Sequence, residues 1–155
     1  MRWFSISLLV VAISCRGEAP TPDTATARRD LDRFHLQFDS LYRSGDAAGI
    51  GQRLTDSAVI SAIELPDLRG RDAIQSVLAP FFAGNTVTAY TLQLIELDVA
   101  ASKAFGRGTF LWASGPRGAA AASRRGRFAA VYQRDSSGTW RLHRLIENLL
   151  PPASP

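Results

Sequence analysis

The stretch from residue 58 to residue 82, AVISAIELP-DLRGRD-AIQSVLAPFF, decides the fold. Its first part, residues 58–65, is rich in β-branched and apolar residues and predicts a strand that ends at Pro66. Gly70 then opens a helix, and Pro80 is expected to break or kink that helix near its end. The predicted buried stripe of this helix consists of Ile74, Val77, Leu78 and Phe81.

Helices are predicted before this stretch. From Arg28 to Ser44, apolar residues recur at the spacing of an amphipathic helix, at Leu31, Phe34, Phe38, Leu41 and Tyr42. Gly45 is a typical helix stop, and Asp46 can cap a second, short helix that runs to about Arg53.

Strands are predicted after it. They cover residues 86–100, 103–114 and 125–134, and a last strand runs from Trp140 to Leu150 after an Asp-Ser-Ser-Gly turn at residues 135–138. Helices and strands that segregate along a chain in this way favour an α+β fold, with an antiparallel sheet packed on helices.

The N-terminus has the pattern of a signal peptide, predicted over residues 1–14. A positive start, Met1-Arg2, precedes an apolar run over residues 3–13. A membrane span needs about 20 apolar residues, so this run has the length of a signal-peptide core instead.

Cys15 changes that interpretation, because Ala12-Ile13-Ser14-Cys15 resembles the lipobox of bacterial lipoproteins. The resemblance implies cleavage before Cys15 and acylation of its thiol, so that the protein is lipid-anchored in the cell envelope on the extracytoplasmic side. The alternative is a plain secretory signal followed by an unrelated cysteine. Residues 15–27 are then a flexible tether, and residues 151–155 a disordered tail.

Composition excludes several other classes of protein. Cys15 is the only cysteine, so no intramolecular disulfide forms, and the two histidines lie far apart in sequence, so we expect no metal and no cofactor. The net charge is +4, and all of the 18 basic residues except Lys103 are arginines. No nucleic-acid recognition motif accompanies this charge, and we therefore expect no nucleic acid partner. The basic loop at residues 117–127 is either a solvated hairpin or a membrane-surface contact.

Five short motifs, in this order, resemble the nuclear-transport-factor-2-like superfamily, and its SnoaL-like branch most of all. They are SGDAA (44–48), TDSAV (55–59), RGRDAI (69–74), AFGRGTF (104–110) and GTWRL (138–142). The resemblance covers residues 28–150. It implies a cone-shaped, strongly curved sheet that wraps about three helices around a pocket, and a homodimer formed through the sheet.

The same resemblance tests one enzymatic activity residue by residue. Steroid isomerases of this superfamily use a helix tyrosine, a base aspartate on the first strand and an oxyanion-hole aspartic acid on a later strand. These positions fall here on Phe38, Ala62 and Ala130, none of which can move or donate a proton. Steroid-type isomerisation is therefore not expected.

Other residues are candidates for the pocket. Glu64 shares a strand face with Ala62 and is either a displaced base or a rim carboxylate. On the first helix, His35 and Tyr42 lie near the face that carries Phe38. On the last strand we expect the more apolar face, with Arg144 and Asn148, to point inward. The opposite register would bring His143 and Glu147 inward as an acid–base pair. Trp112 and Tyr132 are expected pocket walls.

The sequence thus predicts a membrane-anchored domain that binds a small, partly apolar molecule without catalysis. One alternative is a pocket enzyme (a lyase, isomerase or hydrolase) that uses Glu64, or His143 with Glu147. The other is a dimerising accessory module without a ligand.

Overall fold

The computed structural model describes residues 22–62 and 65–151. The predicted signal peptide, Cys15, Glu64 and residues 152–155 of the predicted tail lie outside the described residues. The elements in chain order are α1 (Thr24–Ser44), α2 (Ala47–Gln52), β1 (Leu54–Ser61), β2 (Leu68–Arg69), α3 (Arg71–Gly84), β3 (Asn85–Ala100), β4 (Lys103–Pro116), β5 (Ala122–Arg134) and β6 (Trp140–Leu149). The predicted order of helix, helix, strand, helix and antiparallel meander is confirmed.

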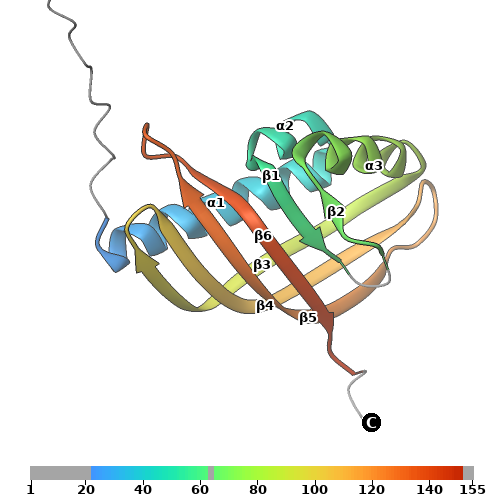
Figure 1. Ribbon diagram of the computed structural model, residues 1–155. Helices are drawn as coiled ribbons and strands as arrows, with labels where there is room; N and C mark the ends of the chain where they lie inside the picture. Colours follow the sequence, from blue (N-terminus) through green and yellow to red (C-terminus); the bar gives the residue numbers. More distant parts are fainter. Residues whose placement is uncertain (1–21, 63–64, 152–155) are drawn as a thin grey trace, which may run out of the picture.

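The strands form one curved, unclosed sheet in the order β2-β1-β6-β5-β4-β3, and the helices pack against it (Figure 1). This arrangement confirms the predicted α+β class. Strands β3 to β6 are antiparallel neighbours, whereas β1 runs parallel to β6. The sheet is therefore mixed at one edge rather than purely antiparallel.

Helix α1 begins four residues before the expected Arg28, because the Asp23 side chain caps it. The Asp23 Oδ1 atom accepts a hydrogen bond from the Thr26 backbone N–H at 2.9 Å. Residues 24–27 therefore belong to the helix rather than to the tether. The other end matches the prediction, since Gly45 adopts φ +71°, the left-handed conformation typical of a helix C-terminus.

The core lies between α1 and the sheet. The predicted stripe of α1 is buried at Leu31, Phe34, Phe38 and Tyr42. It packs against inward-facing residues of the sheet, among them Leu92, Leu94, Phe128, Tyr132, Leu142 and Leu145. Asp39 ties α1 to β3, because its Oδ1 atom accepts a hydrogen bond from the Tyr90 backbone N–H at 2.7 Å. β3 is an edge strand of the sheet, so an N–H of β3 that points away from β4 has no neighbouring strand to pair with.

Strand β1 spans residues 54–61, four residues earlier than the predicted 58–65. Its N-terminal end is fixed by the buried Leu54 and by a hydrogen bond of 2.8 Å from the Leu142 N–H to the Arg53 carbonyl. The chain leaves β1 after Ser61, well before Pro66, because β1 pairs with β6 only as far as the Ser61–Ile146 pair.

Helix α3 continues through Pro80 to Gly84, so of the break or kink expected at Pro80 the break does not occur. Proline removes one backbone donor, whose helical acceptor is the Ser76 carbonyl. Pro80 and Ser76 both lie on the exposed side of α3, so that carbonyl is not enclosed by the protein. The last turn is held by the buried Phe82, and by Arg117, which donates to the carbonyls of Phe82 (2.7 Å) and Ala83 (3.0 Å).

A β-bulge in β6 sets which of its side chains face the helices. Leu142 pairs with Tyr132, but Arg144 pairs with Val131, so His143 is one extra residue in the ladder. Side chains normally alternate between the two faces of a strand. One extra residue therefore puts every later residue of β6 on the opposite face from the one that alternation counted from Trp140 would give. Trp140 and Leu142 face inward before the bulge, and Leu145 is buried after it.

Candidate functional site

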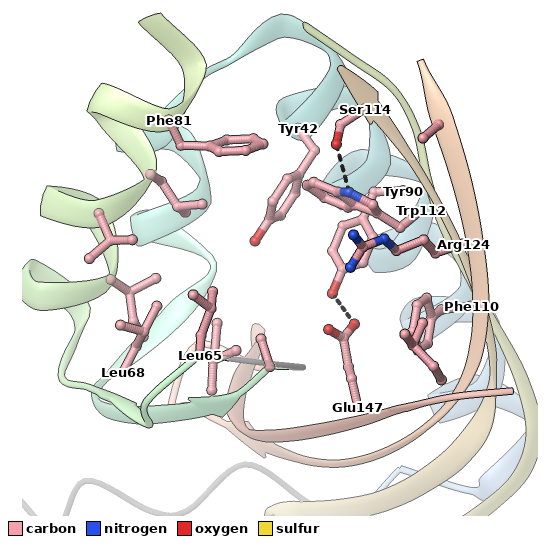
Figure 2. A pocket seen from close by; sticks show the side chains of 17 residues that line it. Tyr42, Leu65, Leu68, Phe81, Tyr90, Phe110, Trp112, Ser114, Arg124 and Glu147 are labelled. Carbon is pink, nitrogen blue, oxygen red and sulfur yellow. Dashed lines mark hydrogen bonds between the residues drawn. The ribbon is translucent and has the colours of Figure 1, made fainter. Parts of the chain in front are cut away.

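A cavity of about 530 Å³ lies between α3 and the concave side of the sheet (Figure 2). This volume is within the range of small-molecule sites, about 300–1,000 Å³. Its lining comes from α1, α3 and all six strands, together with Ala62 and Leu65 between β1 and β2. The lining residues are Tyr42, Ile60, Ala62, Leu65, Leu68, Ile74, Val77, Leu78, Phe81, Tyr90, Phe110, Trp112, Ser114, Ala122, Arg124, Glu147 and Leu149.

One wall is mainly aliphatic and is built by α3 together with Leu65 and Leu68, which precede it. The predicted buried stripe of α3 lines this wall with Ile74, Val77, Leu78 and Phe81. Only Ile74 is fully buried, and Val77 is 40% exposed. The stripe therefore faces a cavity rather than a filled core. Leu65 and Leu149, which also line the cavity, are exposed at its rim.

The opposite wall is aromatic. Tyr42 of α1, Tyr90 of β3 and Trp112 of β4 contact one another edge to face, with ring centroids 4.4 Å apart for Tyr42–Tyr90 and 5.1 Å apart for Tyr90–Trp112. The Trp112 Nε1–H donates to the Ser114 hydroxyl at 2.8 Å. This contact satisfies the indole donor, so the wall presents mostly ring surface to the cavity.

Glu147 of β6 is an acidic group on this largely apolar surface. The Tyr90 hydroxyl donates a hydrogen bond to Glu147 Oε1 at 2.6 Å, which Figure 2 shows inside the cavity. Burial raises the pKa of Glu147, and the bond from Tyr90 offsets part of that increase. Burial and the nearby carboxyl group together raise the pKa of Tyr90 well above its usual value.

Two further polar side chains point into the same cavity in Figure 2, Tyr42 and Arg124. Burial raises the pKa of Tyr42, and the charge of Glu147 adds to that increase, so the hydroxyl and the carboxyl group interact electrostatically. Among the described residues, no hydrogen-bond partner is found for the Tyr42 hydroxyl. The cavity thus combines apolar walls with a small polar cluster, Tyr42, Tyr90 and Glu147, and has Arg124 on its β5 side.

The structure brings four of the candidate pocket and catalytic residues together in this cavity: Tyr42, Ala62, Trp112 and Glu147. Four others, His35, Phe38, Ala130 and Tyr132, are buried in the core and do not line the cavity. Glu64 lies outside the described residues.

The expected inward face of the last strand is corrected by the bulge. Arg144 and Asn148 do not line the cavity; Asn148 is exposed, and Arg144 donates to the Ser57 carbonyl at 2.9 Å. The alternative register is half right, because Glu147 lines the cavity but His143 does not. His143 instead contacts the Thr55 hydroxyl through Nδ1 at 2.9 Å. The expected acid–base pair is therefore not formed.

His35 forms a separate polar contact in the core. Its Nε2 atom and the Tyr132 hydroxyl are 2.7 Å apart, and Phe34 and Phe128 pack around the imidazole ring. Burial lowers the pKa of His35 to about 4, so the ring is neutral at pH 7. This pair is part of the packed interior and does not reach the cavity.

Sequence reasoning missed Tyr90, Phe110, Ser114 and Arg124 as cavity residues. The alternation of the strands contained a usable signal for two of them, because Phe110 and Ser114 share the face of Trp112. Tyr90 follows the register shift in β3, which simple alternation does not reveal. Among residues 22–62 and 65–151, no group of three histidine, cysteine or acidic side chains is placed to hold a metal ion.

Comparisons with known proteins connect this geometry to one fold. No protein-family profile and no curated protein matches the chain. Solved structures do match. A ketosteroid isomerase-like protein from Erwinia carotovora atroseptica is 14% identical, with a TM-score of 0.67 over 84% of this chain and 99% of that one.

Two further similar structures are described as NTF2-like. An NTF2-like protein with a cystatin-like fold from Novosphingobium aromaticivorans is 20% identical (TM-score 0.67, 84% of this chain, 86% of that one). A nuclear transport factor 2 (NTF2-like) superfamily protein from Salmonella enterica serovar Typhimurium is 14% identical (TM-score 0.68, 84% of this chain, 96% of that one). The chain therefore has the nuclear-transport-factor-2-like fold, which commonly forms ligand-binding pockets.

Proposed function

We propose that this protein binds a small, mainly apolar molecule in the cavity between α3 and the sheet, as a SnoaL-like domain anchored in the cell envelope. The observation that carries the proposal is the cavity itself. It measures about 530 Å³, and its walls are aliphatic on one side and aromatic on the other. A folded protein normally fills such a space with its own side chains, so an apolar cavity of this size favours a ligand.

The location of the protein is a further part of the proposal. The lipobox-like sequence at residues 12–15 supports cleavage before Cys15 and attachment of acyl chains to its thiol. Two or more acyl chains are needed for stable anchoring, and lipoprotein processing supplies them. No helix among the described residues is long and apolar enough to cross a membrane. Mass spectrometry of the mature N-terminus tests this part, since an unmodified cysteine or an intact signal peptide would overturn it.

Binding is tested on residues 16–155, which lack the anchor but keep every helix and strand described above. Native mass spectrometry is the first measurement, and an added mass that leaves on denaturation is the expected result. The second is titration with 1-N-phenylnaphthylamine, a neutral dye whose fluorescence rises in apolar surroundings. A protein that carries no added mass and leaves the dye dark would overturn the proposal.

A matched pair of variants locates the binding. Ala122 lines the cavity near its rim, and Ser123, the next residue on β5, lies on the other face of the strand; both are exposed. Ala122→Trp is expected to fill the entrance and weaken dye binding several-fold, while Ser123→Trp leaves it unchanged. Equal effects of the two variants would place the dye outside the cavity.

The enzymatic alternative loses its expected acid–base pair, because Glu147 lines the cavity whereas His143 does not and contacts Thr55 instead.

Dimerisation through the sheet is also part of the proposal. Its outer face carries exposed apolar side chains at Phe105 and Ile146, with Ala129 between their strands. Analytical ultracentrifugation tests this surface, and a monomer at all concentrations would contradict it.

A further inference from the structure

The cavity holds two hydrogen-bonding groups of opposite character at one end. Glu147 accepts a hydrogen bond from Tyr90 through Oε1 only, and among the described residues no donor is found for Oε2. The Tyr42 hydroxyl is likewise without a partner among the described residues, although its ring is in contact with that of Tyr90 at 4.4 Å. Both groups face the cavity rather than a packed neighbour, so a polar group of a molecule bound there can pair with them.

We infer that the ligand of the proposed binding function is an apolar molecule that carries a neutral hydroxyl group, held between Glu147 and Tyr42. A hydroxyl group has one donor and two acceptor positions. It can therefore donate to Glu147 Oε2 and accept from the Tyr42 hydroxyl at the same time, while its apolar body lies between the α3 wall and Trp112. This inference rests on the proposed function and adds the chemical class of the ligand.

Charged head groups fit the same end less well. A ligand carboxylate would lie beside the carboxyl group of Glu147, and two carboxyl groups in one site disfavour their ionised forms. An ammonium group could donate to Glu147, but it has no lone pair to accept a hydrogen bond from the Tyr42 hydroxyl. An ether oxygen could accept from Tyr42 and would leave Glu147 without a donor.

The test displaces 1-N-phenylnaphthylamine from residues 16–155 with four molecules of one chain length: octan-1-ol, 1-methoxyoctane, octanoate and octylamine. Octan-1-ol is expected to displace the dye at the lowest concentration. The difference from the ether should be two- to tenfold, the usual effect of a single hydrogen bond. If octanoate or octylamine is the best competitor, or if alcohol and ether are equal, the inference is overturned.

Three variants assign the two contacts. Tyr42→Phe removes the donor and should weaken octan-1-ol and 1-methoxyoctane alike, by two- to tenfold. Glu147→Leu removes the acceptor and should abolish only the advantage of the alcohol over the ether. Tyr132→Phe is the matched control, because its hydroxyl lies in the core against His35, and it should change neither value.

The outcomes separate the two proposals. Dye bound by the wild-type protein but displaced without preference for the alcohol would refute the hydroxyl site and leave the binding function standing. No binding of the dye or of any of the four molecules would refute both. An alcohol preference that survives in Glu147→Leu would also refute the assigned contact.

Discussion

His35 should make the stability of this protein sensitive to acid in a defined pH range. The ring is 4% exposed, and burial lowers the pKa of its imidazole from 6.5 to about 4. Between these two values the unfolded chain binds a proton at His35 and the folded protein does not. Stability therefore falls as the pH falls from about 6.5 to about 4, and no further contribution is lost below that range.

The size of the effect follows from the two pKa values. Each unit of difference corresponds to about 1.4 kcal/mol, so the full loss is roughly 3 kcal/mol. The measurement is urea unfolding of residues 16–155 at several pH values from 7.5 to 4. His35→Gln cannot take up a proton but still offers Tyr132 an amide partner, so its free energy of unfolding should change less with pH than that of the wild type, by roughly this amount.

A control and a refuting result complete the experiment. His143→Gln alters the other histidine, which lies outside the core, and should keep most of the wild-type pH dependence. Acidic groups also titrate in this range, but they contribute equally to the wild type and to His35→Gln. Parallel curves for these two proteins between pH 7.5 and 4 would show that burial of His35 does not produce the predicted dependence.

Three other predictions follow from the structure. In urea unfolding, the free energy of unfolding of Glu147→Gln should rise relative to that of the wild type as the pH rises from 4 to 8. The pKa of Glu147 is raised in the folded protein, so the wild type loses stability as Glu147 ionises. A difference between the two proteins that does not change with pH would contradict the burial of Glu147. Gly45→Ala should cost about 1 kcal/mol in the same assay because of its φ of +71°, whereas Gly84→Ala, with open space around its Cβ position, should be neutral or slightly stabilising. Asp39→Ala should lower the free energy of unfolding by about 1–2 kcal/mol, because it removes the acceptor of the Tyr90 N–H. Asp39→Asn keeps an acceptor and should lower it less. Equal losses in the two variants would argue against the hydrogen bond between Asp39 and Tyr90.

Much of the fold was predictable because its signals are local. The stripe of α1 and the stop at Gly45 depend on spacing within one helix, and the structure confirms both. The strand boundary at Leu54 depends instead on pairing with β6, whose residues lie far along the chain. Pro80 was misjudged because its cost depends on whether the freed Ser76 carbonyl reaches water, and that follows from the tertiary packing of α3.

The site was less predictable than the fold. Tyr42, Ala62 and Trp112, which are candidate pocket residues in the sequence, do line the cavity. Glu147 was named only as the alternative, because alternation counted from Trp140 crosses the bulge at His143 and reverses there. His35 and Tyr132 have the chemistry of site residues, yet the His35 Nε2 atom and the Tyr132 hydroxyl contact each other inside the core. Periodicity indicates that a side chain points inward, but not whether it meets a cavity or a neighbour.

The bulge at His143 has a genetic consequence. If His143 were deleted, β6 would regain uniform alternation, with Arg144 facing outward between the inward-facing Leu142 and Leu145. Glu147 would then still face the cavity, because the deleted residue is the one that the ladder already passes over. Loss of Ile146 instead would turn Glu147 outward and bring Asn148 inward. Chain length within β6, and not only residue identity, therefore determines which polar groups the cavity presents.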